Sequence, residues 1–182
     1  PLQTLCDRHG LSVAVGLPLP TPDGIRIGMP ILSPRAPRQA YAKQRLHSDE
    51  LPYFVAGDQP LVFELDELRV APAICYESMF IDHAADARAK GAQVYLVSVA
   101  KTAKGIGEGY EHYPEVARTL GLSVLLANCV GPADTFVGAG GSAAWDSRGR
   151  LLASLDDTCE GLILLDTTRS SATAVPLRVL TA

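Results

Sequence analysis

The sequence is short of the features that mark several large classes of protein. No run approaches the roughly 20 apolar residues that a membrane-spanning helix needs, so we expect no membrane partner. The formal net charge is -4 at pH 7, whereas a domain that binds nucleic acid usually carries a basic patch, so we expect no nucleic-acid partner. Four cysteines lie far apart without a Cys-x-x-Cys pair, which indicates neither a zinc site nor a disulfide framework. Reduced thiols in a cytoplasmic protein fit this usage best.

Metal and cofactor motifs are also scarce. His47, His83 and His112 have no second ligand at the spacing of a metal site, so we interpret them as structural or exposed residues and expect no metal or cofactor. What is present is an ordinary globular composition. The chain has 182 residues, 47% hydrophobic and 20% charged, which is enough for one domain with a sizeable core.

Strand-like and helix-like segments alternate until hairpin-like segments take over towards the C-terminus. This pattern predicts an α/β fold in which two packed sheets have helices outside them. We expect a turn at 18–24 and a mobile, glycine-rich loop at 100–109. The expected helices are 3–9, 81–90 and 110–120, and the expected strands are 11–17, 25–33, 61–65, 68–74, 94–99, 123–128, 141–145, 151–155 and 161–166.

Cys75 follows a mostly apolar, strand-like run, and the residues after it predict a turn into a helix starting near Ile81. A nucleophile on such a turn projects from the sheet edge, where backbone N–H groups of the turn and the helix N-terminus face an oxyanion. The alternative is a buried core thiol, since free cysteine is among the most buried residue types. Cys129, beside Asn128, is the rival nucleophile, but it lacks the turn-to-helix context and reads as a core residue.

Four motifs, in order, resemble those of the carbon–nitrogen hydrolase (nitrilase) superfamily. Tyr-x-Lys-x-x-Leu at 41–46 precedes Glu50, and a strand then ends in Cys-Tyr-Glu at 75–77. Ala-Asn-x-x-Gly follows at 127–131. The segment 136–149 resembles the family's Phe-x-Gly-x-Ser hairpin and the Asp/Asn-x-x-Gly turn after it. The resemblance runs from about residue 2 to 166, which is nearly the whole chain.

The resemblance implies a four-layer α-β-β-α sandwich of the nitrilase type, with Cys75, Lys43 and Glu50 in the catalytic site. Cys75 would form a thioester, and Lys43 would stabilise the oxyanion together with the backbone N–H of Tyr76. Glu50 would hydrogen-bond the lysine, and Glu77 would anchor the turn. Tails of family members often lie across a partner subunit, so we expect a homodimer or a higher homo-oligomer.

Each of these side chains also has a plainer interpretation. Taken alone, Lys43 is a solvated surface lysine and Glu50 an exposed loop residue. The ring of Tyr76 reads as part of the core. Only the spacing of the motifs turns these residues into a site.

The chain departs from the family pattern at the general base. In the family that glutamate precedes the strand resembling 11–18, and no residue here matches it or the strand and helix before it. The chain also begins with Pro1 instead of methionine. We therefore expect either a fragment of a longer protein or a truncated member without its own base, with a hydrolase domain over 1–166 and a tail over 167–182. Because a positioned base contributes typically 10²–10⁴-fold, we expect these residues alone to be inactive.

The substrate class follows from the residue after the nucleophile. Family members acting on nitriles usually have Cys-Trp-Glu there, and Tyr76 in place of tryptophan favours amides or ureido compounds. Lipoprotein acyltransferases of the family have Cys-Tyr-Glu but need transmembrane helices, and its glutamine-dependent synthetases carry a nucleotide-binding domain. We expect neither feature from this sequence. A hydrolase acting on a small, non-peptide amide is left. The alternatives are a non-catalytic domain that binds a small molecule or partner and, less favoured, a redox sensor at Cys75.

Overall fold

The computed structural model describes residues 1–177. Three α-helices, one 3-10 helix (η1) and fourteen strands follow one another along these residues. The helices are α1 (Leu2–His9), η1 (Cys75–Met79), α2 (Ile81–Ala89) and α3 (Ala103–Leu120). The strands are β1 (Val13–Ala14), β2 (Leu17–Thr21), β3 (Gly24–Leu32), β4 (Gln39–Ala42), β5 (Phe63–Leu65), β6 (Leu68–Ile74), β7 (Val94–Val99), β8 (Ser123–Asn128), β9 (Val130–Ala133), β10 (Phe136–Ala139), β11 (Ala143–Trp145), β12 (Leu151–Ser154), β13 (Gly161–Asp166) and β14 (Ser171–Pro176).

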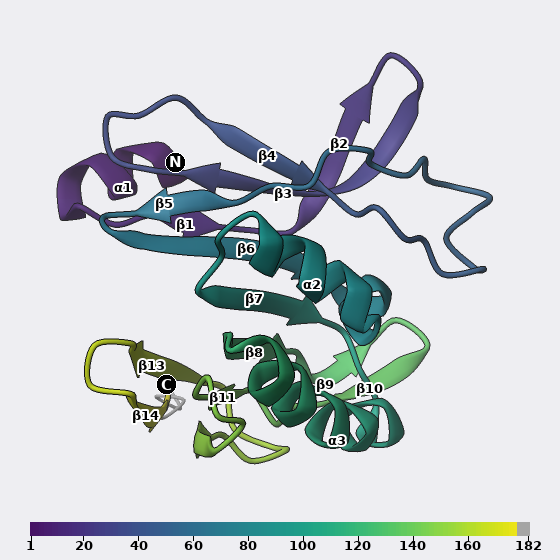
Figure 1. Ribbon diagram of the computed structural model, residues 1–182. Coiled ribbons are helices and arrows are strands. Elements are labelled where there is room, and N and C mark those ends of the chain that lie inside the picture. The colour runs from purple at the N-terminus through teal and green to yellow at the C-terminus, as the bar shows by residue number, and fades with distance from the viewer. Residues whose placement is uncertain (178–182) are drawn as a thin grey trace, which may run out of the picture.

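A six-stranded sheet in the order β12-β11-β8-β7-β6-β5 forms the centre of the fold (Figure 1). Its middle strands β6, β7 and β8 are parallel, and Ile74 pairs with Ser98 while Val99 pairs with Asn128. The three carboxyl ends therefore lie at one edge of the sheet. Helices α2 and α3 are the crossovers, and they bury an apolar core against one face that includes Tyr95, Tyr113 and Trp145.

The second sheet consists of β1, β2 and β4, all paired with the long strand β3. A second apolar core joins Met29, Ile31 and Tyr41 of this sheet to Phe63, Val70 and Val94 of the first. Helix α1 contacts β3. The order of helices, sheet, sheet and helix confirms the predicted four-layer α/β sandwich.

Three expectations about local structure were wrong. The glycine-rich segment expected as a loop is the first half of α3, which begins after the N-cap Thr102. Ile106 and Tyr110 of this half pack on the core, so burial outweighs the low helix propensity of glycine. The expected buried strand at 11–17 is only the two-residue β1, and Leu11 and Leu17 are exposed. The expected turn at 18–24 begins with β2, which admits Pro18 and Pro20 because it pairs on one side only, with β3.

The segment after Asp166, in which the sequence has no clear period, forms β14. It pairs with β13 over six residues, from Asp166–Ser171 to Gly161–Pro176. The last part of the predicted tail, 178–182, lies outside the described residues. Over residues 1–177, no helix has both the length and the apolar character needed to cross a membrane.

Candidate active site

Cys75 begins η1 directly after the last residue of β6, and its backbone has a φ of 51°. A non-glycine residue in the left-handed region is strained, and such residues persist where the surrounding structure holds them. The side chain is half-buried, so Cys75 is not a fully buried core thiol. Helix α2 begins at Ile81, as the sequence predicted. The thiol therefore lies on a strained strand-to-helix turn at the carboxyl edge of the central sheet.

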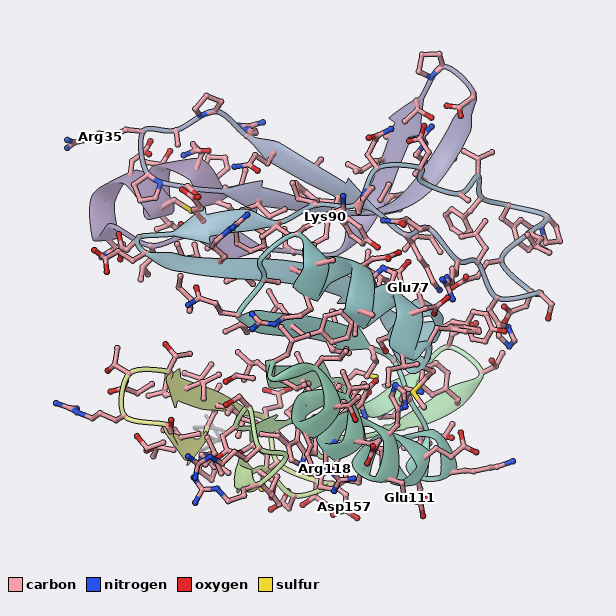
Figure 2. The ribbon with its side chains drawn as sticks, viewed as in Figure 1. Arg35, Glu77, Lys90, Glu111, Arg118 and Asp157 are labelled. Carbon is pink, nitrogen blue, oxygen red and sulfur yellow. The ribbon has the colours of Figure 1, made fainter. Side chains whose placement is uncertain are left out.

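The fully buried carboxylate of Glu77 holds this turn in place. Its Oε1 accepts the backbone N–H of Ile74 at 2.8 Å and the hydroxyl of Tyr41 at 2.7 Å. Its Oε2 accepts the backbone N–H of Gln44 at 2.7 Å. Figure 2 shows Glu77 between the start of α2 and the loop that follows β4. One carboxylate thus joins the residue before Cys75 to the residue after Lys43, which confirms the anchoring role predicted for Glu77.

Lys43 is fully buried, which excludes the solvated interpretation of this residue. Its Nζ donates to both oxygens of Glu50, at 2.6 and 2.7 Å. The Oε2 of Glu50 also accepts the backbone N–H of His47 at 2.7 Å. A buried ammonium needs such a partner, because an unpaired charge inside a protein is costly. The pair predicted between Lys43 and Glu50 is therefore present.

The backbone of Lys43 is held from two sides. Its N–H donates to the carbonyl of Ile27 at 2.8 Å, and its carbonyl accepts the N–H of Gly57 at 2.8 Å. A Cβ at Gly57 would lie 2.4 Å from the carbonyl oxygen of Ala42, so this close approach requires glycine. The loop that follows β4 is thereby packed against the strand that carries the lysine.

A second set of contacts on the turn was not predicted. The hydroxyl of Ser78 donates to the carbonyl of Cys75 at 2.6 Å and lies 2.8 Å from the hydroxyl of Tyr113 on α3. His112 Nε2 lies 3.0 Å from the carbonyl of Ser78. Burial raises the pKa of Tyr113 to about 12 and lowers that of His112, so both are neutral near pH 7. Their helical position gave no sign of this role, because Ser78 lies 34 residues from His112 and 35 from Tyr113.

Asn128, at the end of β8, fastens the neighbouring segments of the same edge. Its Oδ1 accepts the backbone N–H of Lys101 at 2.8 Å, and its Nδ2 donates to the carbonyl of Gly140 at 2.7 Å. Its own backbone N–H donates to the hydroxyl of Ser142 at 3.0 Å. The Ala-Asn-x-x-Gly and hairpin motifs therefore serve to join β8 to the start of α3 and to the segment after β10.

Two side chains differ from expectation. The ring of Tyr76 is 37% exposed and not part of the core, and it contacts the rings of His47 and Phe80 edge-on. Cys129 is half-buried and lines a cavity of about 340 Å³ together with Cys159, so it is not a core thiol. Among residues 1–177, no three or more His, Cys, Asp or Glu side chains are grouped as a metal ion would require.

Comparison with known proteins agrees with this geometry. The sequence model of the carbon-nitrogen hydrolase family matches residues 1–177. The amidase of Nesterenkonia sp. AN1 is similar in structure, with 26% identity, a TM-score of 0.77, and coverage of 86% of this chain and 63% of that one. A glutamate-to-glutamine variant of that amidase, with acrylamide added to its active-site cysteine, gives the same values. Its cysteine-to-alanine variant in complex with butyramide has 24% identity, a TM-score of 0.77, and coverage of 97% and 65%.

The chain thus spans less than two thirds of the length of these amidases. No curated protein sequence matches it.

Proposed function

The chain belongs to the carbon–nitrogen hydrolase family, and from this premise we propose that Cys75 cleaves a small, non-peptide amide or ureido compound through a thioester, releasing ammonia or an amine. The observation that carries the proposal is the strained turn at Cys75, which one buried carboxylate fastens to the segment bearing the buried Lys43. Assembly as a homodimer and a cytoplasmic location stay predictions.

The proposed reaction has two steps. The sulfur of Cys75 attacks the carbonyl carbon, the C–N bond breaks, and the thiol proton leaves with the ammonia or amine. Water then attacks the thioester, the C–S bond breaks, and the acid is released as the sulfur regains a proton. Negative charge develops on the carbonyl oxygen in both steps, where the Lys43 ammonium and the backbone N–H of Tyr76 would stabilise it. We predict that Lys43 Nζ lies within ionic reach of the Cys75 sulfur.

The site offers few groups for proton transfer. Lys43 donates to both oxygens of Glu50, and an ammonium that serves as the oxyanion donor cannot also accept the thiol proton. Glu50 is occupied by Lys43 and by the backbone of His47, and Glu77 accepts hydrogen bonds from the two segments that it joins. These 182 residues should therefore be acylated by a donor whose leaving group needs no proton, but should deacylate slowly.

The experiment that tests the proposal separates these two steps. The 182-residue chain is mixed with p-nitrophenyl butyrate, whose phenolate leaves unprotonated, and nitrophenolate release and intact mass are followed. We expect a burst of about one equivalent per chain and a butyryl group on Cys75 that hydroxylamine removes, with the Cys75→Ala variant as the control. With butyramide we expect no sustained ammonia release.

Three outcomes would change this view. A missing burst, or one that Cys75→Ala retains, would overturn the nucleophile and favour the alternative of a non-catalytic domain that binds a small molecule or partner. Sustained release of ammonia from butyramide by this chain would overturn the slow deacylation. If Glu50→Gln then abolished that release, Glu50 would be the general base.

A further inference from the structure

We propose that His83, neutral and with its proton on Nε2, is a positioning residue that holds Lys43 in register with Cys75 through a buried hydrogen-bond chain, Tyr95–His83–Tyr41–Glu77. The inference rests on the function proposed above and adds to it a residue outside the three catalytic candidates. The four side chains come from β7, α2, β4 and η1, so the hydrogen bonds connect four separate elements of the fold.

The contacts are short and the members are buried. His83 is 7% exposed, with Nδ1 2.7 Å from the hydroxyl of Tyr95 and Nε2 2.9 Å from the hydroxyl of Tyr41. Tyr41 and Tyr95 are 1% and 0% exposed. Tyr41 donates in turn to Glu77 at 2.7 Å. Buried polar atoms are generally hydrogen-bonded, and in this cluster each side chain supplies a partner to the next.

The donor of each hydrogen bond in this network can be assigned by starting at Glu77, whose ionised carboxylate can only accept. The Glu77 carboxylate receives backbone N–H groups of Ile74 and Gln44, so the hydroxyl proton of Tyr41 points to it. The oxygen of Tyr41 is then an acceptor, and Nε2 of His83 must carry the proton. The Nδ1 of a neutral ring accepts, which the hydroxyl of Tyr95 satisfies. In this arrangement each hydrogen bond has one donor and one acceptor, and Tyr41 and His83 each have two partners.

A second proton on His83 would break the arrangement. Nδ1–H would face a hydroxyl whose own proton then has no acceptor in a buried site. Burial is the main cause that lowers the pKa of His83, and Arg45 acts in the same direction. Glu77, whose Oε2 lies 3.8 Å from Nε2, and Asp82 and Asp86 of the same helix oppose it. Burial also raises the pKa of Tyr41 and Tyr95, so both facing hydroxyls stay protonated.

The effect reaches the catalytic residues through the strand. Tyr41 lies in β4, and Lys43 directly follows the last residue of that strand; the two are two residues apart and both are buried, which continues the alternation of the strand. A fixed Tyr41 hydroxyl therefore fixes the strand end from which Lys43 projects. Arg45 adds a second tie between the same segments, because its guanidinium donates to both oxygens of Asp82 at 2.9 and 2.7 Å. Without the imidazole, Tyr41 would lose one of its two partners.

The first test is independent of turnover. In the full chain with ¹⁵N-labelled histidine, the ring nitrogens of His83 are assigned by comparison with the His83→Gln variant. We expect the Nε2–H tautomer at pH 7 and a midpoint of protonation below the ordinary 6.5. A ring with its proton on Nδ1, or one with a midpoint above 6.5, would overturn the inference even if the acylation burst is intact.

The second test measures acylation of Cys75 by p-nitrophenyl butyrate. His83→Leu should lower the maximal burst rate constant roughly 10- to 100-fold and leave the ester concentration at half-maximal rate unchanged, because Lys43 is displaced while the ester site is not. His83→Gln keeps an Nε2 donor for Tyr41 and should stay within about threefold of the wild type. Tyr95→Phe tests the other end of the chain should His83→Leu fail to fold.

Tyr110→Phe is the matched control. The hydroxyl of Tyr110 donates to the carbonyl of Gly141 and takes no part in the hydrogen-bond chain of His83. Equal burst rates in His83→Leu, Tyr95→Phe and the control would show that the network only supports the fold and would overturn the inference. No burst in the wild type would instead overturn the proposed function, and the positioning role with it. The presence or absence of the wild-type burst tells these two failures apart, and the tautomer measurement tests the hydrogen-bond chain independently of both.

Discussion

Cys75 and Cys129 make a natural comparison, because each follows the carboxyl end of a parallel strand in the same sheet and each is half-buried. After Cys75 the chain enters the strained turn of η1 and then α2, whereas after Cys129 it continues into the hairpin of β9 and β10. A buried lysine and a buried carboxylate belong to the first end. The cavity at the second end is lined by the carboxylates of Asp156 and Glu160. The two strand ends therefore differ in the turn that follows and in the buried carboxylate that holds it at Cys75.

The largest effect on this comparison should come from Lys43→Gln. The substitution removes the ammonium from the Cys75 end, and losing one oxyanion donor typically costs roughly 10²- to 10³-fold in rate. The acylation burst with p-nitrophenyl butyrate should slow by that factor. Lys104→Gln is the matched control, because the Lys104 side chain is 88% exposed. A burst that survives Lys43→Gln would remove the electrostatic difference between the two ends.

A smaller effect is expected when the two thiols compete for one reagent. Cys75 should be alkylated by a short iodoacetamide pulse near neutral pH at least roughly tenfold faster than Cys129, because only Cys75 has the strand-to-helix turn and the lysine partner that we propose for it. Peptide mass mapping measures the labelling of each thiol. Preferential labelling of Cys6, Cys129 or Cys159 would contradict the assignment of the nucleophile.

The sequence predicts the three parallel strands of the central sheet especially well. The strands 68–74, 94–99 and 123–128 agree residue for residue with β6, β7 and β8, because buried parallel strands are continuous apolar runs bounded by polar turns. Helix α3 begins seven residues earlier than the expected Tyr110, because packing overrides the propensity of three glycines. Strand β2 was missed because its prolines are tolerated only where pairing is one-sided.

The candidate site, like the fold, contains some residues that the sequence predicts and others that it does not. Lys43, Glu50, Cys75 and Glu77 belong to motifs whose order along the chain is visible in the sequence. The polar groups that support them have no such order. His83 meets Tyr41 across 42 residues and Tyr95 across 12, and only the tertiary fold brings α2, β7 and β4 together at this point. The spacing of Tyr41 and Lys43 on one face of a strand was the one available sign of a shared role.

The smallest expected effect is a difference in acid sensitivity between the two ends. Burial lowers the pKa of both His83 and His112 below the ordinary value of 6.5, and both contact the Cys75 end, through Tyr41 and through the carbonyl of Ser78. Each ring is neutral when folded and gains a proton more readily when its segment opens, so the open form binds more protons. The stability of this end is therefore complete above pH 6.5 and falls as the pH drops towards the lowered folded values, by at most about 1.4 kcal/mol per pH unit for each ring.

Hydrogen exchange measures this difference locally. Between pH 7 and about pH 5.5, protection of the amides of Ile74 and Gln44, which donate to Glu77, should fall relative to that of Gly140, which donates to the carbonyl of Cys129. The double variant His83→Gln/His112→Gln should remove the pH dependence and leave the Gly140 amide unchanged. Equal loss of protection at both ends would mean that they open together, and the Cys75 turn would then not be a separately stabilised unit. Loss confined to the Cys75 end would show that the same buried groups that hold the Cys75 turn also set the pH at which this turn opens.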